Sequence, residues 1–216
     1  MGAGYVGLVT AASFSEMGNN VICVDINKDK VDEIQKGNLP IYEPGLAELV
    51  KRNLAAGRLS FRCQLTDALS STDILFIAVG TPAGPDGNAD LTQFFDVAKV
   101  VGENIVDPLI IVDKSTVPVG TAEQVKTIID AEIKKRGLEL EFHVVSNPEF
   151  LREGSAVQDF MYPDRIVVGA ESEKSRQAME TLYSPFEKKR DRLQFVGVRD
   201  AEMIKYASNA MLAMKI

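Results

Sequence analysis

The stretch that decides the fold is Gly2-Ala3-Gly4-Tyr5-Val6-Gly7, a G-x-G-x-x-G string at the start of an apolar helical pattern, Val6–Met17. In such a string the first glycine makes a tight turn, and the second lets the backbone approach a pyrophosphate. The third glycine lets the helix pack closely on a strand, and the helix N-terminus offers its free backbone amides to an anion. The string therefore predicts a diphosphate site at the opening of this helix.

An acidic residue follows at the spacing that a dinucleotide site requires. Asp25 ends the next predicted strand, Val21–Asp25, roughly 20 residues beyond the glycines. A carboxylate at that place accepts hydrogen bonds from the hydroxyl groups of the adenosine ribose, and it repels the 2′-phosphate of NADP. We therefore expect NAD as the cofactor.

Short β-branched apolar runs alternate with helical patterns along the rest of the chain. The predicted strands are Val21–Asp25, Ile74–Ala78, Leu109–Asp113, Phe142–Ser146, Arg165–Gly169 and Leu193–Val196. The predicted helices are Val6–Met17, Lys28–Lys36, Gly45–Ala56, Leu91–Val101, Thr121–Arg136 and Glu173–Tyr183. The apolar runs are nearly continuous, which is typical of parallel strands with helices on both faces. The pattern indicates an α/β fold, Rossmann-like, with a doubly wound and mostly parallel sheet.

Both ends of the chain look cut. Only Met1 precedes the glycine string, so the first strand of the sheet, which leads into such a string, is expected to be missing. A last helix is predicted from Asp200, as its N-cap, and it is still running at Ile216. We therefore divide the chain into an NAD-binding domain at 1–199 and the truncated start of a central, dimer-forming helix at 200–216. A trimmed chain, a misassigned start and a gene fragment all stay open.

Composition argues against several classes of protein. Of the 216 residues, 45% are apolar and 25% charged, as in an ordinary soluble globular protein. No apolar stretch is long enough for a membrane span, and the formal net charge of −7 argues against a nucleic-acid or anionic-membrane surface. Cys23, Cys63 and the single histidine, His143, form no metal-binding pattern, and two free thiols suit a reducing cytoplasm.

Further strings, in order along the chain, narrow the interpretation. They are Pro-Ile-Tyr-Glu-Pro-Gly-Leu at Pro40–Leu46, Gly80–Pro82 with Asp86-Gly87 and Asp90-Leu91, Ser-Thr-Val-Pro-Val-Gly-Thr at Ser115–Thr121, Ser-Asn-Pro-Glu-Phe-Leu-Arg-Glu-Gly at Ser146–Gly154, and Lys-Tyr-Ala-Ser-Asn at Lys205–Asn209. Together with the glycine string they closely resemble the N-terminal half of the UDP-glucose/GDP-mannose dehydrogenase family, and within it the UDP-glucose branch. The likeness covers essentially the whole chain.

The resemblance implies an enzyme that oxidises the C6 alcohol of a nucleotide sugar to a carboxylate, using two NAD in succession. UDP-glucose is the favoured substrate. In the family a cysteine captures the intermediate aldehyde, and the resulting thioester is hydrolysed. The resemblance also implies a homodimer for the full-length protein. The family's cysteine lies in a glycine-rich Cys-Phe-Pro-Lys-Asp-type string that does not occur here up to Ile216. We therefore expect the fragment to bind NAD at best, without completing the reaction.

The resemblance also implies roles for individual residues. The pyrophosphate is assigned to Gly2, Gly4, Tyr5, Val6 and Gly7, the adenosine ribose to Asp25 and Lys30, and the nicotinamide end to Thr81, Thr116 and Glu153. The sugar is assigned to Glu149, Phe150, Leu151, Arg152 and Glu153, together with Lys205 and Asn209. The catalytic assignments are Thr116 and Glu149, which would position a water, and Lys205 and Asn209, which would face the reacting C6 oxygen.

Elementary chemistry agrees with two of these pairings. Lys205 and Asn209 lie four residues apart and so project from one face of a helix, where a cation and an amide donor can stabilise charge on an oxygen. Glu149 and Glu153 follow a predicted strand at the edge where ligands of open α/β sheets bind. They would share a face if that turn is helical.

Alternatives from other classes stay open. A 3-hydroxy-acid dehydrogenase has a similar architecture and also uses a Lys-x-x-x-Asn pair, although the strings at Pro40–Leu46 and Ser146–Gly154 argue against it. Within the closer family, GDP-mannose or a UDP-acetamido sugar is a possible substrate. A chain without the nucleophile and the first strand also fits a non-catalytic NAD-binding module or a gene remnant.

Overall fold

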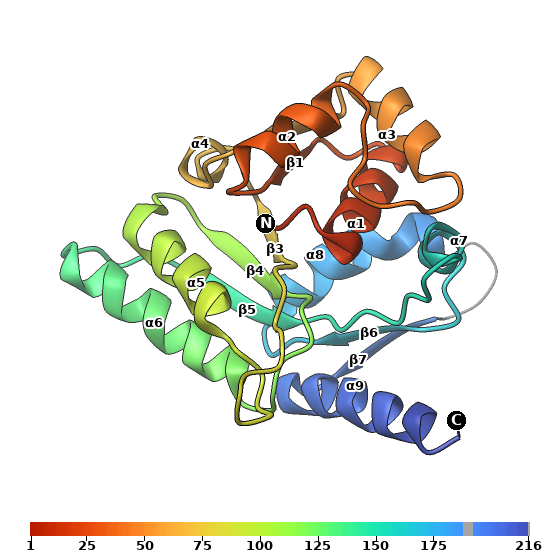
Figure 1. The fold of residues 1–216 in the computed structure, drawn as a ribbon. Coiled ribbons are helices and arrows are strands. Elements are labelled where there is room, and N and C mark those ends of the chain that lie inside the picture. Colours follow the sequence, from red (N-terminus) through yellow and green to blue (C-terminus); the bar gives the residue numbers. More distant parts are fainter. Residues whose placement is uncertain (188–191, 216) are drawn as a thin grey trace.

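The computed structural model describes residues 1–187 and 192–215, and its strands form two neighbouring sheets (Figure 1). One sheet has the order β3-β4-β5-β6-β7 and the other pairs β1 with β2. All these pairings are parallel except that of β5 with β6. The bounds are β1 Val21–Val24, β2 Leu59–Arg62, β3 Ile74–Ile77, β4 Leu109–Asp113, β5 Phe142–Ser146, β6 Ile166–Gly169 and β7 Leu193–Val196. The predicted mostly parallel α/β fold is confirmed.

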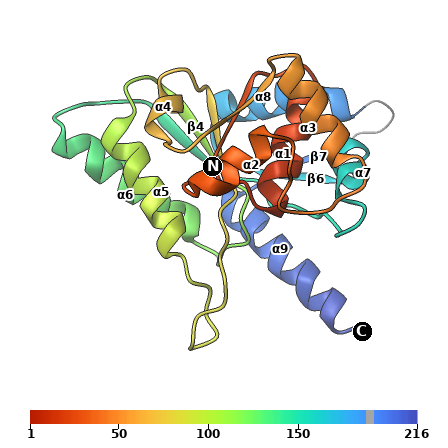
Figure 2. The same ribbon diagram turned by 45° about the horizontal axis from the view of Figure 1, so that its top comes forward.

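Helices connect the strands and cover the sheets (Figures 1 and 2). Their bounds are α1 Tyr5–Glu16, α2 Lys28–Gln35, α3 Leu46–Ala55, α4 Thr66–Leu69, α5 Thr92–Asn104, α6 Thr121–Lys135, α7 Ala156–Met161, α8 Glu173–Tyr183 and α9 Val198–Ala213, with a 3-10 turn, η1, at Ser184–Phe186. In the part of the chain that the structure describes, no helix combines the length and apolarity needed to cross a membrane.

Strand β4 shows why there are two helical layers. All five of its residues are buried. Ile110 and Val112 belong to the core shared with α1 and α8, whereas Leu109 and Ile111 belong to the core shared with α5 and α6. Because successive side chains of a strand point to opposite faces, a continuous apolar run requires a helix layer on each side.

The two sheets meet at the N-terminus, which lies between β1 and β3 (Figure 1). The α-ammonium of Met1 donates to the carbonyl oxygen of Phe76 at 2.6 Å, and the amide of Ala78 donates to the carbonyl oxygen of Met1 at 2.8 Å. On the other side, the amide of Gly2 donates to the carbonyl oxygen of Val24 at 2.7 Å. Met1 and Gly2 therefore make strand-like backbone hydrogen bonds to both neighbours, Met1 to β3 and its C-terminal extension and Gly2 to β1.

The start of α9 differs from the prediction. Asp200 is not the N-cap: it lies in the first turn of a helix whose N-cap is Gly197 and which begins at Val198. An acidic residue is favoured by the helix dipole throughout the first turn, so its presence does not fix the first residue. The close approach of α9 to β6 depends on Gly169, where a Cβ would lie 2.8 Å from the Cα of Val198. The division between residues 199 and 200 thus falls inside α9.

Candidate active site

The glycine string forms the turn that leads into α1. Gly2 has a φ of +99°, and a Cβ there would lie 2.6 Å from the carbonyl oxygen of Ala78. A Cβ on Gly7 would lie 1.8 Å from the carbonyl oxygen of Gly2, so the helix can pass this close only at a glycine. A Cβ on Gly4, in contrast, would meet nothing within 4 Å. Gly2 and Gly7 serve packing, whereas Gly4 leaves room for a ligand beside the helix N-terminus.

The N-terminus of α1 is free to receive an anion. Gly4 is its N-cap, and no side chain of the described residues makes a capping hydrogen bond there. The first backbone amides of a helix have no intrahelical acceptor, so Tyr5, Val6 and Gly7 present the donors that a pyrophosphate needs. The phenol of Tyr5 is engaged elsewhere, because it donates to Oε2 of Glu43. Only the backbone of Tyr5 is therefore available for its predicted role.

Asp25 closes the glycine turn from the end of β1. Its Oδ2 accepts hydrogen bonds from the amide of Ala3 at 2.8 Å and from Nζ of Lys30 at 2.9 Å, and its Oδ1 accepts from the amide of Asn27 at 3.0 Å. Burial works to raise the pKa of Asp25, but these donors outweigh it and leave the pKa below its ordinary value. Asp25 is therefore ionised beside the N-terminus of α1, where a ribose hydroxyl could donate to it. Lys30 lies at the same corner.

Two loops meet at the same edge of the sheet, beyond β3 and β4. The hydroxyl of Thr81 donates to the carbonyl oxygen of Thr116 at 2.8 Å, and the hydroxyl of Ser115 donates to the carbonyl oxygen of Val79 at 2.7 Å. Ligands of open α/β sheets bind outside the carboxyl ends of the parallel strands. Thr81 and Thr116 therefore lie beyond the carboxyl ends of β3 and β4, as Asp25 lies beyond that of β1.

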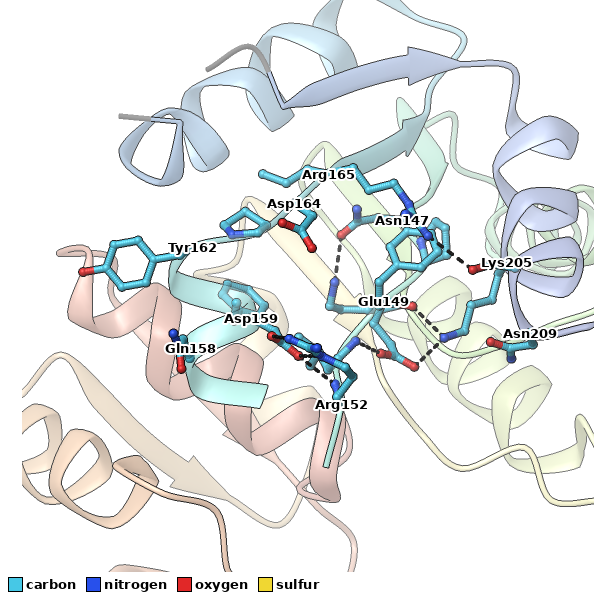
Figure 3. A pocket seen from close by; sticks show the side chains of 18 of the residues that line it. Asn147, Glu149, Arg152, Gln158, Asp159, Tyr162, Asp164, Arg165, Lys205 and Asn209 are labelled. Atoms are coloured by element: carbon cyan, nitrogen blue, oxygen red, sulfur yellow. Dashed lines mark hydrogen bonds and ion pairs between the residues drawn. The ribbon is translucent and has the colours of Figure 1, made fainter. Parts of the chain in front are cut away.

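A cavity of about 560 Å³ opens next to this edge (Figure 3). Most of its lining comes from the segment after β5, from α7 and its connection to β6, and from α9. Nζ of Lys205 donates to Oε1 of Glu149 at 2.8 Å and to the carbonyl oxygen of Glu149 at 2.6 Å. Asn209 lies one turn further along α9 and lines the same cavity. The structure thus brings together Glu149, Lys205 and Asn209, which are up to 60 residues apart in the sequence.

Three further residues assigned to the sugar lie around Glu149 and Lys205. The ring of Phe150 stacks against the guanidinium of Arg165 at 4.2 Å. Arg152 forms an ion pair with Asp159 of α7, with Nη2 to Oδ1 at 2.6 Å. Phe150, Leu151 and Arg152 all line the cavity.

Glu149 and Glu153 do not share a helical face. The segment from Asn147 to Leu151 is not helical, and within it Oε2 of Glu149 turns back to accept a hydrogen bond from the amide of Leu151 at 2.6 Å. Glu153 is exposed in the turn before α7, outside the group of described residues that line the cavity. The helical arrangement considered for this pair is therefore wrong.

Sequence reasoning missed a buried polar cluster at the base of the cavity. Nζ of Lys114 donates to Oδ1 of Asn147 at 3.1 Å, and the same oxygen accepts from the hydroxyl of Tyr183 at 2.5 Å. Burial lowers the pKa of Lys114 to about 8, with the charge of Glu149 opposing this effect. A lysine directly after the apolar run Leu109–Asp113 is the one signal that marks it in the sequence.

Sequence reasoning also gave no role to the acid in the string Pro40–Leu46. Glu43 is buried and accepts hydrogen bonds from the amides of Gly154 at 2.8 Å and Ala156 at 2.7 Å, besides the Tyr5 hydroxyl. Burial and this hydrogen bond to Glu43 raise the pKa of Tyr5 to about 12. Glu43 therefore fixes the start of α1 to the turn that follows the cavity segment.

Comparison with known proteins identifies the family. Residues 1–187 match the model of the NAD binding domain of the UDP-glucose/GDP-mannose dehydrogenase family. The chain belongs to that family. Curated relatives include a UDP-glucose 6-dehydrogenase of Pseudomonas aeruginosa, 48% identical over 216 residues, and one of Bacillus subtilis, 47% identical over 216 residues. Each alignment covers 100% of this chain and 48% of the relative, so the chain spans about half the length of these relatives.

Solved structures of family members have the same fold. A UDP-glucose dehydrogenase from the archaeon Pyrobaculum islandicum superposes with a TM-score of 0.91 at 42% identity, over 100% of this chain and 49% of that one. A GDP-mannose dehydrogenase from Pseudomonas aeruginosa has a TM-score of 0.92 at 35% identity, over 99% of this chain and 49% of that one. The predicted family membership is confirmed, and the 3-hydroxy-acid dehydrogenase alternative is set aside.

The two cysteines of this family member are poor candidates for a nucleophile. Cys23 lies in β1 and is buried, and burial raises the pKa of its thiol to about 11. A thiol that keeps its proton at neutral pH is a weak nucleophile. Cys63 follows β2 and is only partly exposed. Neither belongs to the residues that line the 560 Å³ cavity in the described part of the chain.

Proposed function

We propose that the chain binds NAD and forms the N-terminal half of a site that oxidises the C6 alcohol of UDP-glucose to the carboxylate of UDP-glucuronate. Two neighbouring features carry the proposal. One is the uncapped N-terminus of α1, which lies beside Asp25. The other is the cavity after β5 that holds Lys205 and Glu149. The named relatives at 48% and 47% identity support UDP-glucose as the sugar.

The residues of the glycine turn fit the cofactor. The open position at Gly4 leaves space for the pyrophosphate, and the amides of α1 supply its donors. The ionised Asp25 would accept hydrogen bonds from the ribose hydroxyls and disfavour a phosphate at that place. NAD, when bound, supplies the acceptor for the hydride that leaves C6. Thr81 and Thr116 would line the path towards its nicotinamide.

The cavity residues fit the alcohol. An alcohol that loses a hydride must also lose its hydroxyl proton, so negative charge develops on the C6 oxygen. Nζ of Lys205 and the amide of Asn209 project from one face of α9 and would stabilise that charge. Glu149 holds Lys205 in place through two acceptors, 2.6 and 2.8 Å from Nζ. Glu149 and Thr116 would then position the water that the second half of the reaction consumes.

We propose that the four-electron oxidation is completed by a thiol outside this chain. The environments of Cys23 and Cys63 support this, because burial keeps the first protonated and neither lines the cavity among the described residues. We further propose a cytoplasmic homodimer as the whole protein. The exposed apolar side chains at the end of α9, which projects from the body in Figure 2, are consistent with such an interface: Met211, Leu212 and Met214.

We propose that an extended apolar segment precedes Met1 between β1 and β3, as the first strand of the NAD-binding domain. A cavity of about 420 Å³ at that place is lined by Val21–Val24 of β1, by Ile74–Phe76 of β3 and by α1. Burial lowers the pKa of the Met1 ammonium, although the charge of Asp25 opposes this effect. A peptide bond at Met1 would replace that buried charge.

Calorimetry on the purified chain tests the cofactor proposal. NAD should bind, and NADP should bind at least about tenfold more weakly because its 2′-phosphate faces Asp25. Absence of heat with NAD at millimolar concentration would overturn the proposal. Fusion to the C-terminal half of the Pseudomonas aeruginosa relative then tests the substrate: NADH should form with UDP-glucose, and formation with GDP-mannose alone would replace UDP-glucose as the sugar.

A further inference from the structure

Glu202 of α9 is a buried acid that lies outside the cavity. Its side chain is 2% exposed, and its carboxylate accepts hydrogen bonds from the amide of Gly120 at 2.6 Å and from the amide of Ala122 at 2.9 Å. Gly120 is the N-cap of α6 and has no side chain to cap it. Glu202 therefore caps α6 from another helix, where a negative charge also interacts favourably with the helix dipole.

A neighbouring acid, Asp113, is buried and has no such donors in the described part of the chain. Asp113, at the end of β4, is 1% exposed, and neither of its carboxyl oxygens has a hydrogen-bond partner among the described residues. Burial and, after it, the charge of Glu202 raise the pKa of Asp113 well above its ordinary value. Glu202, in contrast, has two backbone amide donors, from Gly120 and Ala122.

The capped turn is the end of the loop that carries Thr116. At its beginning, this loop is fixed to the segment after β3 by the hydrogen bonds from Thr81 to the Thr116 carbonyl and from Ser115 to the Val79 carbonyl. At its end, it is fixed to α9 through Glu202. The loop is therefore held at both ends, by the segment after β3 at its beginning and by α9 at its end.

On α9, the same residue lies beside the reactive side chains. Lys205 follows Glu202 by three residues, so the two project from the same side of the helix. Lys205 reaches Glu149 in the cavity, whereas Glu202 reaches the start of α6. One turn of α9 thus contacts both Glu149 in the cavity and the end of the loop that carries Thr116.

We infer that Glu202 is a positioning residue that sets the Thr116 loop against Lys205 and so places the nicotinamide half of the cofactor beside the sugar. The inference rests on the proposed NAD function. Glu202 acts through the amides of Gly120 and Ala122 and touches neither ligand.

Comparison of two ligands on the full chain tests this role. ADP-ribose has the pyrophosphate and the adenosine ribose, which face α1 and Asp25, but it lacks the nicotinamide that would reach the Thr116 loop. Glu202→Gln removes the charge and leaves an NH₂ group opposite one backbone amide. It should weaken NAD about tenfold in calorimetry, the loss of one hydrogen bond to a charged group. ADP-ribose affinity should stay within about twofold of the wild type.

The control is a second acid at the same helix contact. Glu123 of α6 pairs with Arg199 of α9 through contacts of 2.7 Å, and both side chains are exposed. Exposed pairs contribute little, so Glu123→Gln should leave both affinities unchanged. If Glu202→Gln does not melt cooperatively, Glu202→Asp keeps the charge on a shorter side chain and should show the same selective loss to a smaller degree.

Each outcome decides the matter. Equal weakening of NAD and ADP-ribose would show a general effect on folding, and unchanged NAD affinity would show no effect on the site; either result overturns the inference. A wild-type chain that binds neither ligand overturns the proposed function, and the inference falls with it.

Discussion

Nζ of Lys205 lies 2.8 Å from Oε1 of Glu149, and the two side chains are 9% and 15% exposed. Removing one member of such a pair leaves the other buried without its partner. The same cation also lies 5.5 Å from the centre of the Phe150 ring. The pair is therefore expected to contribute both to folding stability and to catalysis, and one substitution at each residue can separate the two contributions.

Lys205→Met should abolish turnover while NAD binding persists. In the fusion with the C-terminal half of a relative, we expect kcat to fall at least about 100-fold, because the cation that stabilises charge on the C6 oxygen is gone. NAD affinity of the chain by calorimetry should change less than about twofold. Lys215→Met, at an exposed lysine near the end of α9, is the control and should leave kcat unchanged. Full activity of Lys205→Met would remove Lys205 from the site.

Glu149→Gln should lower stability as well as activity. Lys205 then remains buried opposite a neutral amide, and we expect the free energy of unfolding to fall by roughly 2–4 kcal/mol. Urea unfolding of the isolated chain measures this. Glu153→Gln, in the exposed turn before α7, is the matched control and should stay within about 0.5 kcal/mol of the wild type. Equal effects of the two substitutions would mean that the ion pair carries no stability.

Asp25→Asn should reduce the preference for NAD over NADP. The amide removes the charge that disfavours a 2′-phosphate and one acceptor for the ribose, so NAD affinity should fall about tenfold and NADP affinity much less. Asp29→Asn, at an exposed position of α2, provides the control. Unchanged selectivity in Asp25→Asn would place the adenosine ribose elsewhere.

The lowered pKa of Asp25 also predicts how the free energy of unfolding depends on pH. A carboxyl whose pKa is lower in the folded chain contributes stability above its unfolded value of about 4, and this contribution is lost as the pH falls through the folded pKa. The difference in unfolding free energy between wild type and Asp25→Asn should therefore be constant from pH 8 to about 5. It should shrink below pH 4, as urea titrations in that range would measure.

Lys114 predicts a second rise of stability with pH, in a higher pH range than that of Asp25. Its folded pKa is about 8, whereas an unfolded lysine titrates near 10.4, so between these values the unfolded chain binds more protons and stability rises with pH. The free energy of unfolding of the wild type, relative to Lys114→Met, should increase by about 2 kcal/mol from pH 7.5 to 10. Lys51→Met, at an exposed position of α3, should show no such slope. A flat difference for Lys114→Met would mean that the lysine is hydrated.

The longer helices and most strands could be predicted from the sequence, whereas the shortest helices could not. The bounds of β4 and β5 were predicted correctly because buried parallel strands are continuous apolar runs. Helices α4 and α7 have four and six residues, too few for a helical period to appear, and they were not predicted.

The site divides in the same way. The glycine turn and Asp25 follow from local spacing, because both lie within one turn–helix–strand unit made by the turn, α1 and β1. Lys205 and Glu149 were assigned through family resemblance, since no spacing predicts a contact between residues 56 apart. The cluster of Lys114, Asn147 and Tyr183 forms only when β4, β5 and α8 pack together. No local pattern records such a contact.

The backbone hydrogen bonds that Met1 and Gly2 make to β3 and β1 lead to the last prediction. Met1 contacts β3 and Gly2 contacts β1, so an extended chain before Met1 would run parallel to both strands. A residue of a strand advances about 3.3 Å, and four more residues would reach the far end of β1. Four β-branched residues placed between an initiating methionine and Met1 should fill the 420 Å³ cavity and raise the melting midpoint by about 5 °C or more. A Gly-Ser-Gly-Ser extension of equal length adds the same backbone without apolar side chains, and should raise it much less. Equal midpoints for the two extended chains would mean that the cavity does not accept a strand.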